Sequence, residues 1–378
     1  MANILINGLS AKAGGGKSIL NNYLTLLTQS KPEHRFFLLA PEKLEYEKYA
    51  SEFIHIIDVG KSYKINTLFP LLYYIVMPRL LRSHKIDIIF NLGDVPVPSN
   101  IPQVYLFDWS YAVYPESVVW KRMDSKSRLS RRVKLFVFKK WIRHATTVIA
   151  QTETMKGLLA SLYGLDNIAV IPNAVSLDNM TTGEPFDFDL PNGKTKLLYL
   201  TYYYPHKNLE VFLPLARKIR EMLLPYCIVV TIDSSQHTRA KEFLNNIREE
   251  GLDDIIVNVG AVAMDAVPSL YAQCDALLMP TLLESFSGTY VEAMYHQKTI
   301  LTSDLDFSRD VCGDAAFYFD PLDPDNILSA ITLAFGEDRE RELRLEKGRM
   351  KLGGLLSWEQ VFDEYQALLE DTITESYR

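Results

Sequence analysis

The sequence predicts an α/β protein made of two doubly wound domains, and three observations lead to this expectation. At 378 residues the chain exceeds the size that one hydrophobic core usually supports. Short apolar runs of strand length alternate with helical patterns along the chain, which is typical of parallel sheets covered by helices. A polar stretch at residues 176–194, rich in Gly, Pro and Asp, interrupts this alternation and is typical of a linker.

The alternation gives one set of elements on each side of the linker. Before it, the pattern predicts strands at 3–7, 35–40, 53–57, 86–91, 103–107, 146–150 and 168–171, and helices at 16–29, 66–83, 130–144 and 152–163. After it, we expect strands at 196–201, 226–232, 255–259, 275–279, 299–302 and 316–319, and helices at 207–222, 237–250, 265–273, 288–297, 324–335 and 357–373. Two such domains imply a cleft, and open α/β sheets bind ligands beyond the carboxyl ends of their strands.

Composition excludes several classes of protein. A hydrophobic content of 48% with 23% charged residues describes an ordinary soluble globular protein, and the net charge of -7 argues against general nucleic-acid binding. The three cysteines and seven histidines lack metal-ligand spacing, so we expect neither a metal site nor a disulfide framework. The first residues predict a strand instead of a signal peptide, and the longest apolar run, 68–77, is too short to span a bilayer. A cytoplasmic location is therefore expected.

The most informative motif is the stretch PTLLESFSGTYVEAM at residues 280–294. Glu284 follows an apolar strand, small residues form a loop, and Glu292 lies about one turn into the next helix. A helix N-terminus offers free N–H groups and a positive partial charge, so a phosphate can bind at Gly288 and Thr289. Two carboxylates beside it can accept sugar hydroxyls, and together these groups suit a nucleotide sugar. As a bare pair, however, the two glutamates would more often be solvated residues around a capped helix.

A second motif, YYYPHKNL at residues 202–209, follows the first strand of the second domain. His206 and Lys207 lie where a strand ends and a helix begins, and a lysine there can neutralise a diphosphate as a point charge. Alone, this motif would more often be a polar helix start. Beside the glutamate motif of the same domain, it predicts a second phosphate-binding arm.

The first strand is followed by AGGGKS at residues 13–18, where glycines permit close approach of a ligand to the backbone. With Ala11, the segment also fits a permissive P-loop pattern whose strict form has Gly at that position. A P-loop NTPase would need an apolar strand that ends in Asp, whereas Asp87 and Asp275 precede their apolar runs. Such an enzyme would also leave the second domain unexplained, so we keep it as a minority alternative.

The segment from Trp120 to His144 holds ten of the forty Lys and Arg residues and a single acid, Asp124. A basic helix interleaved with aromatic residues is attracted to anionic membrane surfaces. A solvated helix whose aromatic residues enter the core explains the pattern equally well. The membrane alternative predicts a surface formed by Arg128, Arg131, Arg132, Lys134, Lys139, Lys140 and Trp141.

Taken together, these segments resemble the retaining glycosyltransferases of family 4, and the resemblance covers almost the whole chain. Residues 146–175 resemble the end of that family's first domain, residues 255–294 its donor-site core, and the segment from Leu356 its tail helix. The resemblance implies the GT-B fold, in which two Rossmann-like domains face each other across a cleft. It implies an acceptor domain at 1–180, a nucleotide-sugar donor domain at 190–355, and a tail helix at 356–378 that packs back on the first domain.

The resemblance also implies roles for individual residues. Glu284 would face the hydroxyls of the donor sugar, Glu292 would accept from the ribose, and Lys207 would neutralise the leaving diphosphate. The loop from Gly260 to Val262 would line the base. The remaining donor-side contacts would come from Gly15, Gly16, Tyr202, His206, Ser287, Gly288 and Thr289.

The sequence departs from the family pattern at two positions. Tyr202 stands where the family usually has an arginine, five residues before Lys207, so His206 would have to supply part of the missing charge. Phe107 and Asp108 stand where the family often has a His-Asp pair. Asp108 follows a buried strand and would orient the acceptor hydroxyl, although such an aspartate can also be a helix N-cap.

These observations predict a metal-independent retaining hexosyltransferase that needs no cofactor and uses a UDP- or GDP-linked sugar. The resemblance implies front-face attack, and the basic segment suggests a lipid-linked or membrane-borne glycan acceptor, as in bacterial surface polysaccharide synthesis. The enzyme would then be peripheral at the inner face of the plasma membrane. A nucleotide-sugar-binding subunit without activity stays open because the arginine is missing. An epimerase or hydrolase of the same donor class would need further acid and base residues.

Overall fold

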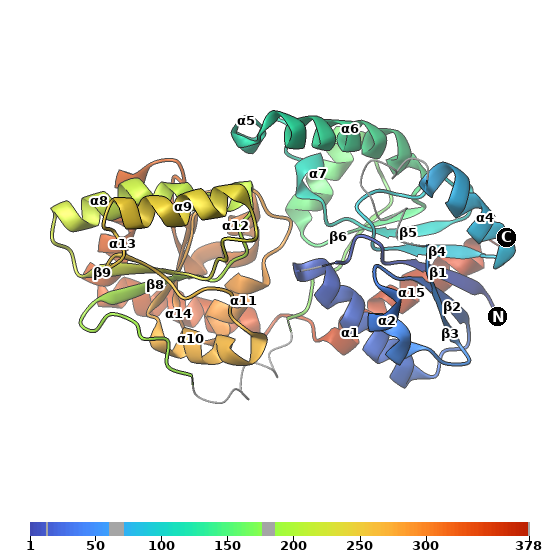
Figure 1. Cartoon of the computed structure of the whole chain (residues 1–378). Helices are drawn as coiled ribbons and strands as arrows, with labels where there is room; N and C mark the ends of the chain where they lie inside the picture. Colours follow the sequence, from blue (N-terminus) through green and yellow to red (C-terminus); the bar gives the residue numbers. More distant parts are fainter. Residues whose placement is uncertain (13, 60–71, 176–185, 377–378) are drawn as a thin grey trace. The chain divides into compact units, whose positions relative to one another are not determined.

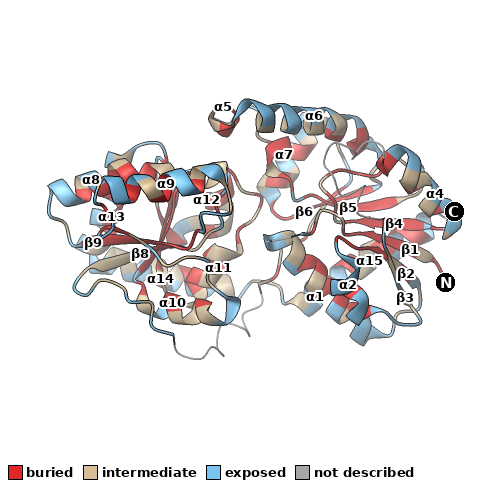
Figure 2. Cartoon of the chain, in the orientation of Figure 1, coloured by how far each residue is buried: buried red, intermediate tan, exposed pale blue. Residues whose placement is uncertain are grey.

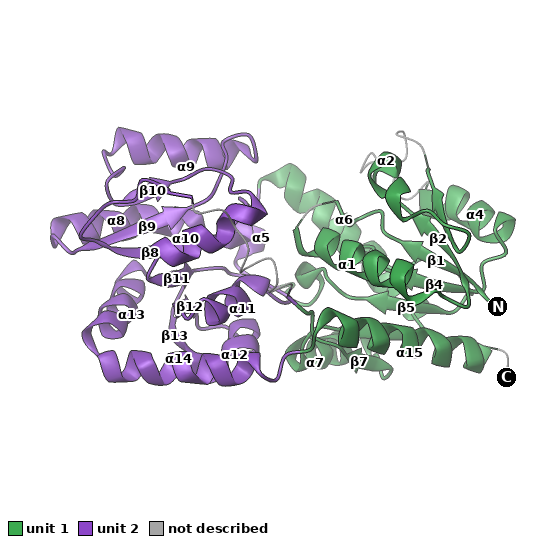
Figure 3. Ribbon diagram, turned by 90° about the horizontal axis from the view of Figure 1, so that it is seen from below, with its two compact units in different colours: residues 1–115, 124–174, 356–378 green, residues 116–123, 175–355 purple. Residues whose placement is uncertain are grey.

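The computed structural model describes residues 1–12, 14–59, 72–175 and 186–376 (Figure 1). The chain divides into two compact units (Figure 3). Unit 1 comprises Met1–Pro115, Asp124–Ala174 and Leu356–Arg378, and unit 2 comprises Glu116–Met123 and Val175–Leu355. The sequence placed residues 116–123 in the first domain, whereas they pack with unit 2. Residues 66–71 of an expected helix and 176–185 of the expected linker lie outside the described residues.

Unit 1 is built on a parallel sheet with the strand order β3-β2-β1-β4-β5-β6-β7. Its strands are β1 (Asn3–Asn7), β2 (Arg35–Leu39), β3 (Ile54–Ile57), β4 (Ile88–Asn91), β5 (Gln103–Leu106), β6 (Thr147–Ala150) and β7 (Ile168–Val170). Its main helices are α1 (Gly14–Ser30), α2 (Lys43–Tyr46), α4 (Met77–Ser83), α6 (Ser125–Trp141), α7 (Glu153–Tyr163) and α15 (Trp358–Ser376). A π-helical turn, η4 (Leu72–Val76), precedes α4. Short 3-10 turns are η1 (Glu47–Tyr49), η5 (Ser110–Ala112) and η6 (Ile142–His144).

Unit 2 is built on a second parallel sheet, with the order β10-β9-β8-β11-β12-β13. Its strands are β8 (Thr195–Tyr199), β9 (Tyr226–Val230), β10 (Ile256–Asn258), β11 (Ala276–Met279), β12 (Thr299–Ser303) and β13 (Ala316–Phe319). Its helices are α5 (Val119–Arg122), α8 (Phe212–Glu221), α9 (Thr238–Glu249), α10 (Val267–Gln273), α11 (Gly288–Tyr295), α12 (Asp306–Cys312), α13 (Pro324–Gly336) and α14 (Asp338–Leu352). Its 3-10 turns are η8 (Pro205–Lys207), η9 (Leu209–Val211), η10 (Met264–Ala266) and η11 (Gly313–Ala315).

Local sequence signals define where several helices begin and end. α7 begins after Thr152, whose side chain accepts a hydrogen bond from the Met155 N–H at 3.2 Å. The helix ends at Gly164, which has a φ of +64° and therefore the left-handed backbone that glycine adopts at low cost. α6 begins in the same way after Asp124, whose carboxylate accepts from the Ser127 N–H.

Each sheet is the centre of its own hydrophobic core, and the strands of both are largely buried (Figure 2). The tail helix α15 belongs to unit 1, as expected. Tyr365 of α15 packs against Phe90 of β4 with ring centroids 5.4 Å apart, and Phe362 packs against Tyr23 of α1 at 5.4 Å. The apolar face of α15 therefore closes the core of unit 1.

The expected and observed elements differ mainly in unit 2. The helix expected from residue 207 begins only at Phe212, because Asn208 adopts a left-handed conformation with φ of +57° between two short 3-10 turns. The sequence pattern also missed α12 and α14. Ten of the fifteen residues of α14 are charged, and among its described residues only Gly348 is buried, so it lacks the apolar stripe that marks an amphipathic helix.

Candidate functional site

The loops that carry Lys207 and Glu284 follow two neighbouring strands of unit 2. β8 is the first strand of this sheet in chain order, and it pairs with β9 on one side and β11 on the other. The strand order therefore reverses between β8 and β11. In open parallel sheets, the crevice beyond the carboxyl ends of the strands at such a reversal is the usual ligand site. Both motifs found in the sequence converge on this place.

The two loops are held together by hydrogen bonds that involve the backbone. The Leu282 N–H donates to the His206 carbonyl at 2.8 Å, and the Thr281 hydroxyl donates to the same oxygen at 3.3 Å. The fully buried Tyr199 hydroxyl of β8 donates to the Lys207 carbonyl at 3.0 Å. The positions of the lysine and of the glutamate loop are therefore fixed by the sheet itself.

Lys207 and Glu284 form an ion pair in which the lysine Nζ donates to Glu284 Oε1. Their side chains are only 15% and 13% exposed, so the pair is mostly removed from water. The Thr281 hydroxyl also lies 3.2 Å from Glu284 Oε1, so its single proton is shared between this oxygen and the His206 carbonyl. A cation is thus held at the strand-order reversal beside a carboxylate that can accept hydroxyl groups. This arrangement suits a ligand with a negative phosphate and a neutral sugar.

Asn208 fixes the backbone next to Lys207, and it also contacts Arg122, a residue that the sequence did not single out. Its fully buried side chain donates from Nδ2 to the carbonyls of Pro280 at 3.1 Å and Pro321 at 2.7 Å. Its Oδ1 accepts from the Arg122 guanidinium. Arg239 in turn donates to the Arg122 carbonyl at 2.7 Å. Arg122 lay within the basic segment of the sequence, and no local pattern indicated that it contacts the lysine loop.

The N-terminus of α11 follows the Glu284 loop and carries the other expected phosphate contacts. Ser287 precedes the helix, and Gly288 and Thr289 form its first turn, where backbone N–H groups lack partners within a helix. One turn later, Glu292 Oε2 accepts a hydrogen bond from the buried Tyr271 hydroxyl at 3.2 Å. Burial raises the pKa of Glu292 to about 7, while the bond from Tyr271 lowers it.

The remaining donor-side residues lie around these loops. Tyr202 is 50% exposed, and its ring packs against Tyr204 with centroids 5.3 Å apart. Tyr204 stacks on His206 at 5.4 Å. Gly260 follows β10 with φ of +76°, a conformation that glycine adopts easily, and Val262 packs against the core of unit 2. Unit 2 thus supplies an aromatic group where the family usually has a positive charge.

Two family models together match most of the chain. The model described as Glycosyltransferase Family 4 matches residues 14–179, and the model described as Glycosyl transferases group 1 matches residues 181–350. The second match contains the Lys207 and Glu284 loops. The chain belongs to the family 4 glycosyltransferases.

Individual relatives agree with this membership. The O-antigen chain mannosyltransferase RfbU of Salmonella typhimurium is 23% identical over 199 residues, which are 52% of this chain and 53% of that protein. The mannosylfructose-phosphate synthase of Agrobacterium fabrum is 24% identical over 37% of this chain and 31% of its own length. The match therefore spans about half or less of each of these two relatives.

Solved structures show that this family 4 chain has the GT-B fold. The sucrose-phosphate synthase of Thermosynechococcus elongatus superposes with a TM-score of 0.73 at 14% identity, over 99% of this chain and all of that one. HepE of Anabaena, solved in complex with UDP and glucose, superposes with a TM-score of 0.69 at 16% identity, over 98% of this chain and all of that one.

The glycine-rich turn and Asp108 of this family 4 chain lie together in unit 1. A Cβ atom at Gly16 would lie 3.6 Å from Asp108 Oδ2, and Gln151 Nε2 donates to Asp108 Oδ1 at 3.5 Å. Gly15 lies beside Gly16 in the exposed first turn of α1. Lys17 forms an ion pair with Glu45 of α2 at 2.5 Å, so it is engaged within unit 1. The structure brings Gly16 and Asp108 together, in a unit other than the one that holds Lys207.

The membrane surface expected on α6 needs correction. Trp141 is only 1% exposed and packs against Tyr73 with centroids 5.4 Å apart, so the prediction that it lies on the surface is wrong. Lys134 forms an ion pair with Asp94, and the Arg131 guanidinium lies 4.6 Å from the Tyr111 ring centroid. Arg128 is partly buried as well. Of the seven expected residues, Arg132, Lys139 and Lys140 are exposed.

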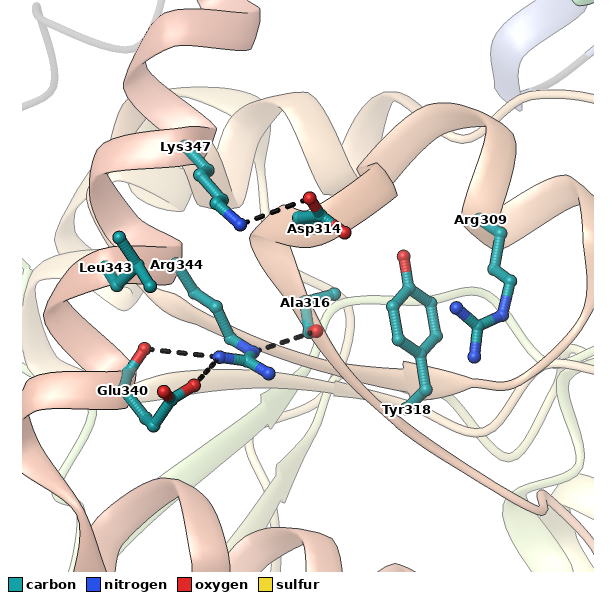
Figure 4. A pocket seen from close by; sticks show the side chains of 8 residues that line it. All are labelled: Arg309, Asp314, Ala316, Tyr318, Glu340, Leu343, Arg344 and Lys347. Atoms are coloured by element: carbon teal, nitrogen blue, oxygen red, sulfur yellow. Dashed lines mark hydrogen bonds and ion pairs between the residues drawn. The ribbon is translucent and has the colours of Figure 1, made fainter.

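A hollow of about 340 Å³ on unit 2 holds none of the expected site residues (Figure 4). It lies beside β13, an edge strand of the sheet. Arg344 donates to the Ala316 carbonyl of this strand at 3.2 Å, and Lys347 pairs with Asp314 at 3.1 Å. The Arg309 guanidinium lies 4.2 Å from the Tyr318 ring centroid. These charged side chains cover a sheet edge that would otherwise be open to pairing with another strand.

The described part of the chain holds neither a metal-binding cluster nor a membrane-spanning helix. Within residues 1–12, 14–59, 72–175 and 186–376, no three His, Cys, Asp or Glu side chains cluster in a way that could hold a metal ion. Over the same residues, every helix is too short or too polar to cross a bilayer. The expected independence from metal remains a prediction.

Proposed function

We propose that the chain is a retaining hexosyltransferase that moves a sugar from a UDP- or GDP-linked donor to a hydroxyl of a lipid-linked or membrane-borne glycan in bacterial surface polysaccharide synthesis. The observation that carries this proposal is the Lys207–Glu284 pair at the strand-order reversal of unit 2, next to the N-terminus of α11. The names of RfbU, an O-antigen mannosyltransferase, and of the HepE complex with UDP and glucose support it.

In the proposed reaction, the bond between the sugar C1 and the diphosphate oxygen breaks and a bond from C1 to the acceptor oxygen forms on the same face. The acceptor proton passes to the leaving phosphate oxygen. Lys207 and the first N–H groups of α11, at Gly288 and Thr289, stabilise the negative charge that develops on the diphosphate. Glu284 binds the sugar hydroxyls once Lys207 turns to the phosphate. Asp108 of unit 1 keeps its predicted role of orienting the acceptor hydroxyl.

The first test is a thermal-shift screen of the purified protein against UDP, GDP, ADP and ATP, each with Mg²⁺ or with EDTA. A ligand at about 100 times its Kd should stabilise the fold by roughly 2.7 kcal/mol. We expect stabilisation by UDP or GDP that EDTA does not remove. Stabilisation by ATP and Mg²⁺ alone would favour the P-loop alternative, and a Lys17→Ala variant would then lose it. Stabilisation without turnover of any matching nucleotide sugar would favour a non-catalytic binding subunit, which Tyr202 keeps open.

We further propose that the outer face of α6 binds an anionic membrane surface. Leu129, Val133 and Phe136 form an exposed stripe at helical spacing, with exposed fractions of 65%, 53% and 71%. The exposed residues Lys126, Arg132, Lys139 and Lys140 flank this stripe. An apolar stripe bordered by cations suits the boundary between acyl chains and anionic headgroups.

Co-sedimentation with vesicles tests the α6 proposal. Vesicles that contain phosphatidylglycerol should bind the protein at low salt, and vesicles of pure phosphatidylcholine should not. Phe136→Ser should weaken binding several-fold because it removes the apolar centre of the stripe. Met350→Ser is the matched control, since Met350 is 69% exposed on unit 2. An equal loss of vesicle binding in both variants, or equal binding to anionic and neutral vesicles, would contradict the proposal.

A further inference from the structure

Tyr271 is a buried residue that contacts the proposed ribose-binding carboxylate from a different helix. Its side chain is fully buried on α10, and its hydroxyl lies 3.2 Å from Glu292 Oε2 and 3.4 Å from the Thr289 carbonyl. A tyrosine hydroxyl has one proton, and the carboxylate is the stronger acceptor. The geometry therefore indicates that Tyr271 donates to Glu292 and fixes one of its two oxygens.

The other carboxylate oxygen of Glu292 faces the N-terminus of α11. A Cβ atom built on Gly288 would lie 4.0 Å from Glu292 Oε1. Glycine at this position therefore keeps the space between the carboxylate and the first turn of the helix open. A ribose attached to a diphosphate on that first turn would meet Oε1, while Oε2 stays with Tyr271.

We propose that Tyr271 is the positioning residue for ribose recognition, because it holds the Glu292 carboxylate so that Oε1 accepts the 2′-hydroxyl of the nucleotide's ribose. This inference rests on the proposed function, since it requires that unit 2 binds a nucleotide sugar. It goes further in naming the residue that makes the site select a ribonucleotide over its 2′-deoxy form. Tyr271 acts through Glu292 and does not itself touch the nucleotide.

The surroundings of the carboxylate support this role. Burial raises the pKa of Glu292 to about 7, and the hydrogen bond from Tyr271 opposes this rise. Behind the tyrosine, His296 stacks on its ring with centroids 4.7 Å apart. Burial, and to a smaller extent the charge of Lys298, lower the pKa of His296. On the other side of α11, Gly348 of α14 packs on Met294. Among the described residues, Tyr271 is the titratable group that contacts the carboxylate directly.

These contacts determine the sign of the pH dependence. A protonated Glu292 is a weaker acceptor than a carboxylate, so ribonucleotide affinity should fall as the pH drops through about 7. Tyr271→Phe removes a bond that stabilises the charged form, so the midpoint of this fall should move to higher pH. In this variant the Glu292 carboxylate should also be less well oriented at every pH.

The test is calorimetric titration of the purified protein with UDP, GDP and their 2′-deoxy forms at about pH 6, 7 and 8. A hydrogen bond to a charged group is worth about tenfold or more in affinity, so the wild type should prefer the ribose form by about tenfold at pH 8. Tyr271→Phe should lose most of this preference. Tyr290→Phe is the matched control, because Tyr290 is equally buried and bonds to the Thr302 hydroxyl at 2.7 Å instead. Glu292→Gln should abolish the dependence on pH.

The outcomes separate the inference from the proposed function. If wild-type protein binds neither UDP nor GDP, both fail. If it binds one of them with a ribose preference that Tyr271→Phe leaves intact, with the same pH midpoint, the inference alone fails. Should Tyr271→Phe not fold, 3-fluorotyrosine at position 271 replaces it, since a more acidic hydroxyl donates more strongly. The midpoint should then move to lower pH, and an unchanged midpoint would overturn the inference.

Discussion

The two sheets of the molecule share a strand order, but different side chains lie at the point where that order reverses. In both, the first strand pairs with the second on one side and the fourth on the other. At this reversal in unit 1, the strand ends carry Asn7 and Asn91, whose side chains bond at 2.9 Å, and Asn7 also donates to the Tyr73 hydroxyl at 3.0 Å. At the reversal in unit 2 lies the Lys207–Glu284 ion pair.

The amide network of unit 1 is buried and closely packed at the ends of its strands. Asn7 and Asn91 are fully buried, and a Cβ atom at Gly93 would lie only 2.8 Å from Asn7 Nδ2. In unit 2, a Cβ atom at Gly288 would meet its nearest described neighbour at 3.5 Å. The same strand order therefore carries different side chains at its reversal, a buried amide network in unit 1 and an ion pair in unit 2.

The largest effect should come from removing the cation of unit 2. Lys207→Ala should lower kcat about 10²- to 10³-fold, because the charge that develops on the leaving diphosphate loses its held partner. Steady-state kinetics with the donor sugar found by screening measures this. Lys17→Ala is the control, since Lys17 pairs with Glu45 in unit 1 and should leave kcat almost unchanged. Equal losses in the two variants would contradict the assignment of the anion site to unit 2.

Disrupting the amide network of unit 1 should lower the stability of the protein and leave its nucleotide affinity unchanged. Asn91 accepts from Asn7 and the Gly93 N–H and donates to the Val95 carbonyl and Gln103. Asn91→Ala leaves these buried partners unsatisfied, so the free energy of unfolding should fall by roughly 3 kcal/mol. Urea unfolding measures the loss. Asn22→Ala, at a partly exposed position of α1 whose hydrogen bond to the Ser18 carbonyl is open to solvent, should change the same free energy by less than about 0.5 kcal/mol.

A loss of UDP or GDP affinity in the folded Asn91→Ala variant would contradict the prediction that the two reversals have different roles. It would show that the reversal in unit 1 takes part in nucleotide binding.

Much of the fold could be predicted because strands and helices leave different periods in the sequence. The buried strands of both sheets lie close to the expected ranges, and the apolar spacing predicted the tail helix, whose packing on the first domain was implied by the family resemblance. α14 was missed because two thirds of its residues are charged and its few apolar residues form no buried stripe. The delayed start of α8 was missed because the left-handed Asn208 is stabilised by carbonyls of Pro280 and Pro321, which are distant in the sequence.

The candidate site could be predicted only where its residues follow strands. Lys207 and Glu284 each come just after an apolar run, so the sequence indicated that they lie at the same sheet edge. Arg122 and Tyr271 carry no such signal, because their partners are 86 and 21 residues away and the contacts exist only after folding. Trp141 was placed wrongly because a basic helix pattern does not reveal which face packs on Tyr73.

A smaller effect is expected from Arg122, which donates a hydrogen bond to Asn208 next to Lys207. Arg122→Ala removes the partner of Asn208 Oδ1, so the Lys207 backbone should become less ordered and nucleotide affinity should fall about three- to tenfold. Calorimetric titration with the nucleotide that binds the wild type measures this. Arg143→Ala, at an exposed position of unit 1, is the control. If only the control changed affinity, the role given to Arg122 in unit 2 would be wrong.

The smallest effect should come from restoring a charge that this chain lacks. Tyr202 is 50% exposed next to Tyr204, so an arginine there would attract the diphosphate only through solvent-screened charge. Tyr202→Arg should therefore tighten nucleotide binding by about two- to fivefold at low salt, and the gain should shrink at high salt. Tyr202→Gln, which adds no charge, is the control for lost aromatic packing. If the arginine gave no gain at low salt, Lys207 and the N-terminus of α11 would bind the diphosphate without a further cationic contact. The anion site of unit 2 would then consist only of the two hydrogen-bonded loops that carry Lys207 and Glu284.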